Sequence, residues 1–468
     1  MTSGETLSLP ADGKRPRAGA AGACFYVVMH ADQPLETGAR CSLADLDEVE
    51  IGRAEKRRIS RAGRRLSLEL PDLWVSSRHA ALSKVLGSWA IEDRQSHNGT
   101  RVNGAPVDRA PLADGDVIEV GQTFLLFRDG NSADEHPVDD FQEPITLAPG
   151  LATLSPPLAA RCERLRDIAA SSVPVLVLGE TGTGKELMAS AVHLLSGRAG
   201  PFQAVNCGAL PANLVESELF GFRKGAFSGA TEDRPGLIRS AARGTLFLDE
   251  IGDLPGPAQA ALLRVLQQGE VLPIGATQPV PVDFRLVSAT HRKLDELVAR
   301  DRFRADLLAR ISGFTVELPT LRQRREDIGL IVGQLLRRHL ADRAAKTTFT
   351  AEAVRALLRY EWPLNVRELE RSLQAAVALA GTGAIQLRHF PPAVTASPGP
   401  ARPREVSPPD ATVLSDRDRE LRDSVVAALK ASNGNIAAAA RTLGKARVQV
   451  QRWIKRFGID LKELRAPP

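Results

Sequence analysis

Residues 179–186, which read GETGTGKE, constrain the fold of this chain more than any other segment. An apolar run at residues 173–178 precedes them and predicts a buried parallel strand, and residues 187–195 have the apolar spacing of a helix. A strand, a glycine-rich turn carrying a lysine, and a helix together form the context of a phosphate-binding loop. Glycines let successive backbone N–H groups point at phosphate oxygens, and the helix N-terminus adds partial positive charge. The sequence therefore predicts a nucleotide site here.

Every residue of this loop is a candidate nucleotide contact. Lys185 is expected to supply a positive charge to the β- and γ-phosphates. Glu186 stands where many such loops have Ser or Thr, so that position offers no hydroxyl to Mg²⁺. The candidates are Gly179, Glu180, Thr181, Gly182, Thr183, Gly184, Lys185 and Glu186.

A second apolar strand, at residues 245–248, ends in the acidic pair Asp249 and Glu250. Carboxylates at the C-terminal end of a buried strand beside a phosphate loop form a Walker B arrangement. Asp249 is expected to hold Mg²⁺, directly or through water, and Glu250 to polarise the attacking water. Farther along, Arg304 and Arg310 lie on a predicted helix and are candidates to stabilise an anionic transition state. The alternative for both arginines is a solvated helix surface.

Residues 25–127 follow another pattern, in which short apolar segments alternate with turn residues and predict a β-sandwich. Three loop motifs interrupt it: IGR at residues 51–53, SSRHA at 76–80, and DRQSHNGTRVNG at 93–104. Together these motifs resemble a forkhead-associated (FHA) domain. The resemblance implies a reader of phosphothreonine peptides, in which Arg53 pairs with the phosphate, Ser76 donates its hydroxyl and Asn98 holds the peptide backbone. His79 is expected to brace these loops.

The FHA-like region also carries a dense basic run. Residues 53–65 contain seven Lys or Arg against one Glu. Such a run is usually a solvated loop, and the alternative is a widened site for phosphate or an acidic peptide.

A second resemblance covers the central part of the chain. The segments GETGTGKE, VNCGAL, ELFGFRKGAFSGA, GTLFLDEIGDL, FRADLLARI, LPTLRQRREDI and WPLNVREL occur in the order seen in bacterial enhancer-binding proteins. These proteins are AAA+ ATPases that activate sigma-54 RNA polymerase. The resemblance implies that Asn206 restrains Glu250 until the nucleotide state changes. It also implies that Arg304 and Arg310 reach the nucleotide of a neighbouring subunit, and that Arg367 in a helical lid senses the nucleotide.

The segment GAFSGA resembles the loop with which this family contacts sigma-54, with Ser228 in place of Thr. An apolar Phe between glycines is either tucked into a turn or a mobile tip that docks a partner. Other departures from the family are His291, where Asn is usual beside the nucleotide, and Arg243 and Leu364, where Gly is usual. The predicted contact residues are Gly225, Ala226, Phe227, Ser228, Gly229 and Ala230.

The C-terminal segment predicts a helix-turn-helix. Residues 417–431 and 436–443 have helical patterns, Asn435 is a good N-cap between them, and a basic helix follows at 447–457. This segment resembles the Fis-like DNA-binding module that ends the family. Carried over, the recognition helix includes Arg447, Gln449, Gln451 and Arg452. The alternative is a solvated amphipathic helix.

The expected fold is therefore multidomain: a β-sandwich, an α/β P-loop ATPase with an α-helical lid, and an all-α helix-turn-helix. A net charge of +5 directs nucleic-acid binding to a local patch, and four scattered cysteines without a CxxC pair favour a reducing compartment. No apolar run approaches the ~20 residues of a membrane span. We expect a disordered leader at 1–23, the FHA domain at 24–130, a linker at 131–145, the α/β part at 146–320, the lid at 321–395, a Pro-rich linker at 396–414 and the DNA-binding domain at 415–468.

The functional hypothesis is a cytoplasmic transcriptional activator that uses ATP and Mg²⁺ and contacts no membrane. Its expected partners are sigma-54 holoenzyme, enhancer DNA, a phosphothreonine protein or Ser/Thr kinase, and further copies of itself, from dimer to hexamer. Three alternatives remain at this point. They are a DNA-binding regulator that uses ATP only for assembly, a general AAA+ chaperone or loader, and a phosphopeptide scaffold with an inactive ATPase.

Overall fold

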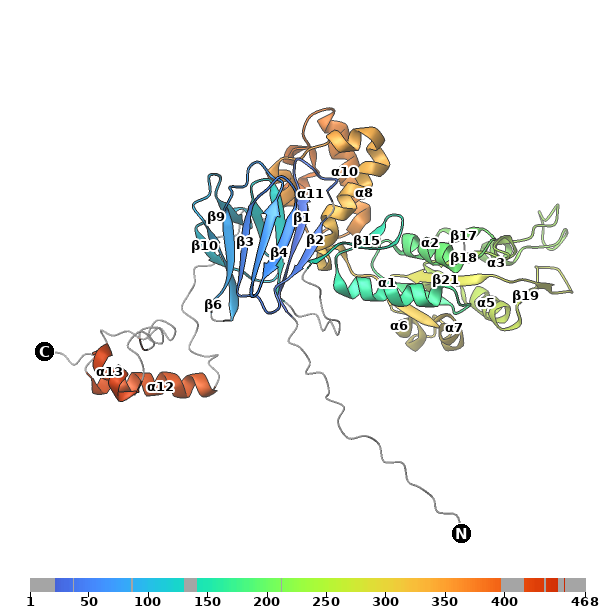
Figure 1. The fold of residues 1–468 in the computed structure, drawn as a ribbon. Coiled ribbons are helices and arrows are strands. Elements are labelled where there is room, and N and C mark those ends of the chain that lie inside the picture. Colours follow the sequence, from blue (N-terminus) through green and yellow to red (C-terminus); the bar gives the residue numbers. More distant parts are fainter. Residues whose placement is uncertain are drawn as a thin grey trace, which may run out of the picture. The chain divides into compact units, whose positions relative to one another are not determined.

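The structure is a computed structural model that describes residues 22–36, 38–85, 87–129, 141–211, 213–396, 416–432, 435–444 and 450 (Figure 1). The chain divides into two compact units, Met1–Ala401 and Arg402–Pro468, which are treated separately. Residues 1–21 of the predicted leader and residues 397–414 of the predicted Pro-rich linker lie outside the described residues. Among the helices within the described ranges, none combines the length and apolar character needed to cross a bilayer.

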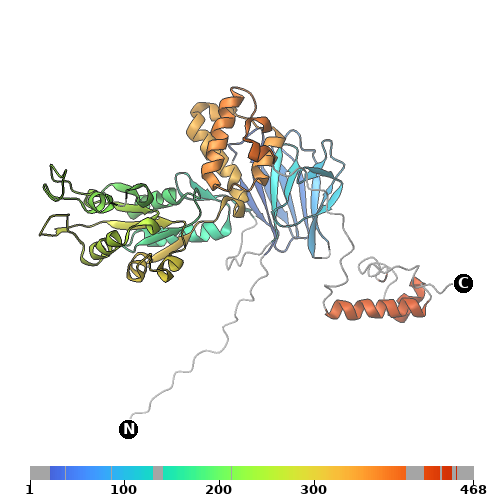
Figure 2. The same cartoon turned by 180° about the vertical axis from the view of Figure 1, so that it is seen from behind.

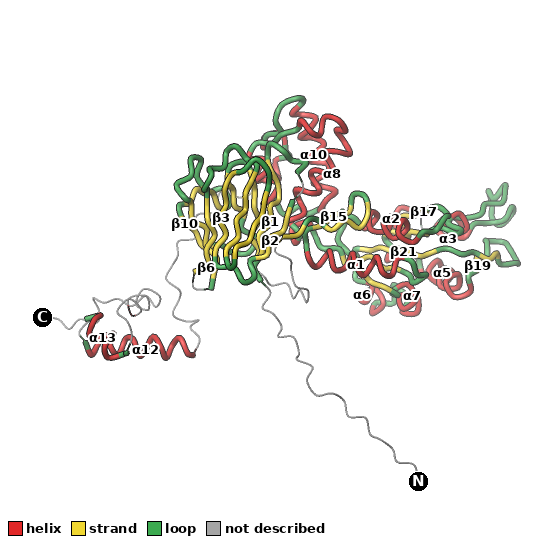
Figure 3. Tube along the Cα trace, in the orientation of Figure 1, coloured by secondary structure: helices red, strands yellow, loops and turns green. Residues whose placement is uncertain are grey.

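The first part of the larger unit is a sandwich of two β-sheets, which Figure 3 shows as a block of yellow strands. One sheet has the strand order β13-β2-β1-β12-β11-β8-β9 and the other β10-β7-β6-β3-β5-β4. The strands of the first sheet are β1 (Cys24–His30), β2 (Ala39–Ser42), β8 (Thr100–Val102), β9 (Ala105–Val107), β11 (Val117–Val120), β12 (Thr123–Arg128) and β13 (Phe141–Gln142). Those of the second are β3 (Glu48–Arg53), β4 (Arg58–Ala62), β5 (Arg65–Leu70), β6 (Ala80–Val85), β7 (Ser88–Asp93) and β10 (Arg109–Pro111).

Alternating side chains explain the sandwich. In β5 the leucines Leu66, Leu68 and Leu70 are buried and the residues between them are more exposed, as expected for a strand with one face on a core. The prediction of a β-sandwich is confirmed. The predicted linker at 131–145 is wrong at its C-terminal end, because Phe141 and Gln142 form β13 and pair with β2, where an edge strand offers free backbone hydrogen-bonding groups.

The central part is an α/β domain whose parallel sheet has the order β17-β18-β21-β16-β22. The strands are short apolar runs, as expected when helices cover both faces (Figure 2). The sheet comprises β16 (Val175–Leu178), β17 (Phe202–Asn206), β18 (Thr245–Asp249), β21 (Arg285–Thr290) and β22 (Phe314–Glu317); the pairs β14 (Ile145–Ala148) with β15 (Leu151–Thr153) and β19 (Glu270–Val271) with β20 (Val280–Pro281) lie outside it. The helices are α1 (Pro156–Ala169), α2 (Lys185–Ser196), α3 (Val215–Phe220), α4 (Leu237–Ser240), α5 (Gly256–Gln268), α6 (Leu294–Ala299) and α7 (Ala305–Ile311).

A helical lid follows the sheet. Its helices are α8 (Ile328–Leu340), α9 (Ala351–Arg359), α10 (Asn365–Ala380) and α11 (Pro392–Thr395). Turns over Leu321–Gln323 and Arg325–Asp327 join it to β22. Trp362, just before α10, is fully buried, and its indole N–H donates to Leu357 O at 2.9 Å. The structure therefore agrees with the lid expected at residues 321–395.

The smaller unit contains α12 (Asp416–Ala431) and α13 (Ile436–Thr442). A small core joins them through Val425, Leu429 and Ala439. Two helices were expected in this region, and the assignment to a helix-turn-helix stays a prediction. The predicted DNA contacts Arg447, Gln449, Gln451 and Arg452 lie outside the described residues.

Candidate functional site

The phosphate loop connects β16 to α2 at the C-terminal edge of the parallel sheet. Gly182 and Gly184 have φ of +79° and +104°, which L side chains rarely adopt. A Cβ at Gly182 would lie 2.2 Å from the backbone oxygen of Leu364, so the loop fits against the lid only with glycine there. Because the loop leads directly into the N-terminus of α2, the helix adds partial positive charge and free N–H groups that favour phosphate.

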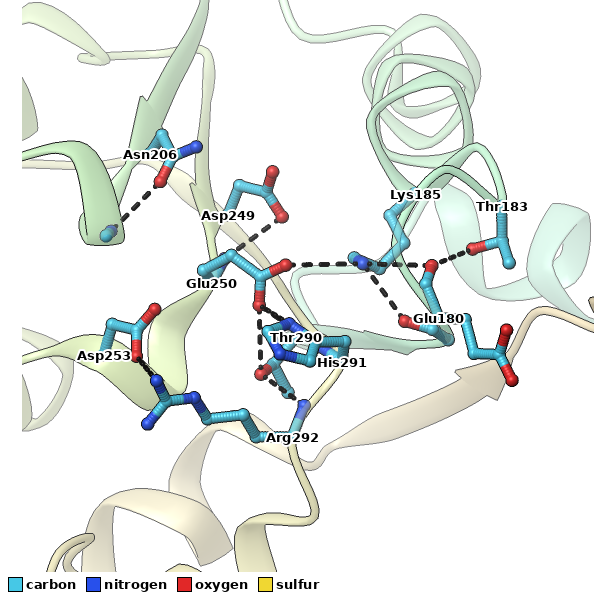
Figure 4. A network of polar contacts seen from close by, with 12 residues as sticks. Glu180, Thr183, Lys185, Asn206, Asp249, Glu250, Asp253, Thr290, His291 and Arg292 are labelled. Atoms are coloured by element: carbon cyan, nitrogen blue, oxygen red, sulfur yellow. Dashed lines mark hydrogen bonds and ion pairs between the residues drawn. The ribbon is translucent and has the colours of Figure 1, made fainter. Parts of the chain in front are cut away.

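Lys185 begins α2 and is only 7% exposed. Its Nζ donates to the backbone oxygens of Gly179 at 3.1 Å and Glu180 at 3.4 Å, and lies 3.5 Å from Oε1 of Glu250 (Figure 4). The loop thus turns its buried cation toward the carboxylate pair at the end of β18, which is the arrangement that phosphates and a metal between them require.

Asp249 ends β18, and Glu250 follows in the left-handed region with φ of +52°. A non-glycine residue held there indicates local strain, which is common at functional sites. Burial raises the pKa of Asp249, and the neighbouring Glu250 charge adds to that effect. Burial also acts to raise the pKa of Glu250, but Lys185 and the hydrogen bonds from His291 outweigh it and lower the pKa. The pair therefore offers one half-buried carboxyl group as a ligand for a cation and one ionised carboxylate as a base.

His291, at the end of β21, holds Glu250 in place. Its Nδ1 lies 2.7 Å from Oε2 of Glu250, and its backbone N–H donates to the same oxygen at 3.2 Å. The Thr290 hydroxyl donates to that oxygen at 3.4 Å. Asn206, which was expected to restrain Glu250, instead accepts hydrogen bonds from the backbone of Gly208 and Ala209, so its predicted role stays a prediction.

Three further residues bind the phosphate loop, and the sequence did not indicate a role for them. They belong to the lid and to the hinge, by which we mean the turns at residues 321–327 that join β22 to α8. Asn365 is fully buried, and its Nδ2 donates to Thr181 O at 3.0 Å and to Glu180 Oε2 at 3.2 Å. Arg322 pairs with Glu180 at 2.6 Å, and Arg324 donates to Thr183 O at 2.9 Å. The polar residues of LPTLRQRREDI and WPLNVREL were the available signal for these contacts.

Arg367 lies against the same loop: a Cβ added at Gly182 would be 3.0 Å from the Cβ of Arg367. Its side chain is exposed, as expected for a residue that contacts bound nucleotide. Leu364, where the family resemblance expects glycine, has φ of −102° and therefore needs no glycine. The positive φ values of this turn occur at Trp362 and Asn365 instead.

The two predicted arginine fingers are exposed on α7 and its N-cap, away from the contacts around Lys185. Arg304 pairs with Asp306 at 2.7 Å, and Arg310 donates to Leu266 O at 2.9 Å. Neither contact involves a residue of the nucleotide site of its own chain. The role of both arginines at a neighbouring subunit stays a prediction.

The GAFSGA segment forms a tight loop after α3. The N–H of Gly225 donates to Ala230 O at 2.9 Å, and the N–H of Ala230 donates to Phe227 O at 3.0 Å. The Phe227 ring meets Phe222 edge-on at 5.0 Å between centroids and remains 43% exposed. Ser228 is exposed beside it. The loop presents a half-exposed aromatic tip. One side of the Phe227 ring packs within the turn and the rest is open to a partner, so both alternatives considered from the sequence apply in part.

The predicted phosphothreonine residues converge on residues 73–76 of the sandwich. Arg53 donates to Leu73 O at 3.5 Å, and Asn98 donates to Trp74 O at 2.8 Å. The Ser76 hydroxyl accepts from the backbone N–H of His97 at 3.1 Å. Arg53 and Asn98 are exposed, so one loop edge presents a guanidinium, an amide and a hydroxyl. These are the groups that recognise a phosphorylated peptide.

His79 braces these loops from inside. It is fully buried, its Nδ1 accepts from the N–H of Ser76 at 3.0 Å, and its Nε2 lies 3.2 Å from Gly99 O. The Nδ1 atom must therefore be unprotonated and Nε2 must carry the hydrogen. Burial lowers the pKa of His79, which keeps the ring neutral. The expected structural role agrees with this geometry.

Three parts of the chain match known protein families. Residues 151–317 match the sigma-54 interaction domain family, residues 322–406 match the AAA+ ATPase lid domain family, and residues 49–121 match the FHA domain family.

Individual relatives share the central region. The acetoin catabolism regulatory protein of Cupriavidus necator is 43% identical over 313 residues, covering 65% of this chain and 46% of that protein. The hydrogenase transcriptional regulatory protein HoxA of the same organism is 42% identical over 326 residues, covering 68% and 67%. The crystal structure of NtrX from Brucella abortus in complex with ATP gives a TM-score of 0.47 at 28% identity, covering 66% and 69%. This chain thus matches less than half of the first protein and about two thirds of the other two.

Proposed function

This chain belongs to the family of transcriptional regulators that carry a sigma-54 interaction domain, and from that premise we propose that it hydrolyses ATP to activate sigma-54 RNA polymerase. One observation carries the proposal. A glycine-rich phosphate loop, a half-buried carboxylate pair and an exposed aromatic loop all belong to the same α/β domain. A binding-only domain needs the first of these features but neither of the others.

The residues around the loop fit ATP with Mg²⁺. The loop N–H groups and Lys185 would bind the phosphates, and Asp249 would hold Mg²⁺, which neutralises charge on them. Glu250, kept ionised by Lys185 and His291, would polarise the attacking water. Arg367 would contact the nucleotide from the lid.

Hydrolysis would need a second copy of the chain. Arg304 and Arg310 are exposed, and their side chains bond Asp306 and the backbone of Leu266 rather than a residue of the phosphate loop. Supplied to a neighbour, an arginine finger raises turnover by about 10³–10⁵-fold. A head-to-tail ring, such as a hexamer, would supply one such arginine to every site.

The GAFSGA loop would deliver the work of hydrolysis to sigma-54. Phe227 is 43% exposed and flanked by Gly225 and Gly229, both at positive φ. An aromatic tip on a glycine-hinged loop suits a contact that forms and releases during each cycle. Ser228 keeps the hydroxyl of the family's threonine and loses only a methyl group.

The terminal domains would supply location and control. The C-terminal unit, with Arg447, Gln449, Gln451 and Arg452, would bind enhancer DNA as a dimer. The FHA domain, with Arg53, Ser76 and Asn98, would bind a phosphothreonine on a partner protein or on a Ser/Thr kinase.

Promoter opening by purified sigma-54 holoenzyme tests the proposal. The full chain with ATP is expected to open the promoter, Glu250→Gln to lose both ATP turnover and opening, and Phe227→Ala to lose opening while keeping turnover. Leu379→Ala, which shortens another exposed apolar side chain, is the matched control and is expected to behave as wild type. Opening that survives both Glu250→Gln and Phe227→Ala contradicts the proposal.

A further inference from the structure

Side chains on one face of the FHA sandwich share a hydrophobic core with the lid of the same chain. Tyr26 and Val28 of β1 and Phe124 of β12 belong to the same hydrophobic core as α8 and α9 of the lid. At Gly329 the backbone of α8 approaches β1 so closely that a Cβ would lie 1.9 Å from Val28 O. Such close backbone approach indicates that α8 and β1 pack tightly against each other.

Two ion pairs join the FHA domain to the lid. The FHA domain supplies the acid of one pair and the arginine of the other. Arg355 of α9 binds Glu119 of β11 through two hydrogen bonds of 2.7 Å, and Glu119 is only 4% exposed. Arg128 of β12 binds Glu326 of the lid at 2.9 Å, and Glu326 is 5% exposed. Each domain therefore contributes one acid and one arginine. Removing either arginine would leave a buried carboxylate without its partner, which is strongly unfavourable.

The second pair reaches the hinge of the ATPase. Arg128 also donates to Gln323 O at 3.1 Å, within the turns that join β22 to α8. The same turns carry Arg322 and Arg324, which bind Glu180 and Thr183 of the phosphate loop. The FHA domain is thus attached to the segment that connects the lid to the nucleotide site.

A continuous set of contacts links this surface to the peptide-binding edge. Asp72 is buried, and its carboxylate accepts from the N–H groups of Trp74 and Gln122 at 2.8 and 2.7 Å. The Ala31 N–H donates to Gln122 O at 2.9 Å, and Ala31 O accepts from the N–H of Phe349 in the lid at 2.8 Å. A phosphate bound by Arg53 would compete with the carbonyl of Leu73, which adjoins Asp72.

We propose that the FHA domain clamps the hinge between the two halves of its own ATPase, and that a phosphothreonine peptide loosens the clamp. Lid movement relative to the α/β domain accompanies nucleotide turnover in hinged enzymes, and a second domain fixed to both lid and hinge opposes it. The clamped chain therefore turns over ATP slowly, and the released chain turns it over faster. This inference rests on the proposed function, because it presumes an ATPase and a phosphothreonine reader.

Charge reversal at Glu119 and Arg355 tests the clamp in the full chain. Glu119→Arg and Arg355→Glu are each expected to increase amide hydrogen exchange at Phe349 and along α9, and to raise ATP turnover about fivefold or more. The double variant, which restores the pair with its charges exchanged, is expected to return both values toward wild type. Arg109→Glu, which reverses an exposed charge elsewhere on the sandwich, is the matched control and should change neither.

The peptide arm uses a phosphothreonine peptide mixture and its unphosphorylated twin. The phosphorylated mixture is expected to raise turnover of the wild type, and to add little to Glu119→Arg, in which the clamp is already open. Single variants that gain hydrogen exchange without gaining turnover overturn the clamp, and so does a double variant that behaves like the singles. A wild type without any ATP turnover contradicts the proposed function instead, while its hydrogen exchange still reports the FHA–lid contact.

Discussion

Nδ1 of His291 lies 2.7 Å from Oε2 of Glu250, at the end of the strand next to the one that Glu250 follows. A carboxylate only accepts hydrogen bonds, so Nδ1 carries the hydrogen in this contact. The side chain thereby fixes the carboxylate that would act as the base, in a backbone conformation that is itself strained. His291 is a positioning residue, and it replaces the asparagine that the family resemblance expects.

Removing this contact is expected to slow hydrolysis. His291→Ala leaves Glu250 held by Lys185 and by backbone and hydroxyl donors alone, and a misplaced base costs on the order of 10²-fold in kcat. His291→Asn keeps a side-chain N–H donor and is expected to lose less. Steady-state ATP turnover measures both, with His97→Ala in the FHA domain as the control. Equal kcat values for His291→Ala and wild type would contradict the positioning role.

Arg53 is expected to dominate phosphopeptide binding. Its exposed guanidinium donates to the backbone carbonyl of Leu73 over a long 3.5 Å, so it can exchange this weak contact for a phosphate. Hydrogen bonds to charged groups contribute about 1.5–3 kcal/mol, so Arg53→Ala should weaken binding by roughly tenfold or more. Calorimetry with phosphorylated and unphosphorylated peptides measures this. Arg109→Ala, which removes an exposed arginine from β10, should bind as the wild type does.

The FHA domain is expected to lose stability in mild acid because of His79. Burial lowers the pKa of His79 below its ordinary value of about 6.5, more than the Asp93 and Asp72 carboxylates and the bond to Gly99 raise it. The unfolded chain then binds more protons than the native state, so stability is present above about pH 6.5 and is lost as the pH falls toward the lower native pKa.

Thermal unfolding between pH 7.5 and 5 measures this loss. Protonated Nδ1 could no longer accept from Ser76, so the midpoint of the FHA transition should fall with pH. His79→Gln, which does not titrate, should show a smaller fall, and His97→Gln should follow the wild type because His97 is exposed. A fall of equal size in the His79 and His97 variants would exclude His79 as the cause.

Local sequence patterns predicted the structural features that depend only on residues close together in the sequence. Alternation along β5 identifies a strand with one buried face, and the glycines of the phosphate loop identify a turn that an L residue could not form at Gly182. The carboxylates after β18 follow from the same logic, because parallel strands end at one edge of a sheet. These features need no knowledge of distant segments.

Contacts between segments far apart in the sequence could not be predicted from local sequence patterns. Glu119 meets Arg355 across 236 residues of sequence, and both have the composition of ordinary surface positions. Periodicity indicates that β1 and α8 are buried, but not that they are buried against each other. Sequence patterns also do not show when a residue other than glycine adopts a left-handed conformation. Arg243 does so, with φ of +59°, at a position where the family resemblance expects glycine. Compensating contacts can hold a residue there, as the backbone bonds of Arg243 to Gly200 and Asp283 do.

Asn365 gives the sharpest test of the contact between lid and phosphate loop. Its Nδ2 donates to Thr181 O and Glu180, and its Oδ1 accepts from the N–H of Leu321, so one buried amide joins the lid, the hinge and the loop. Its φ of +55° adds a backbone requirement that asparagine tolerates and alanine does not. Loss of the side chain leaves buried polar groups without partners, which costs about 1–3 kcal/mol for each group.

Two substitutions separate the amide from the backbone. Asn365→Gly removes the hydrogen bonds but accepts the positive φ, and Asn365→Ala removes the hydrogen bonds and strains the backbone. Both are expected to weaken binding of a fluorescent ATP analogue and to lower the unfolding midpoint of the ATPase, with Ala the more severe. Leu364→Ala, at the exposed neighbouring position, is expected to leave both unchanged. If Asn365→Gly binds nucleotide as tightly as the wild type, the amide does not organise the loop, and only the turn geometry matters.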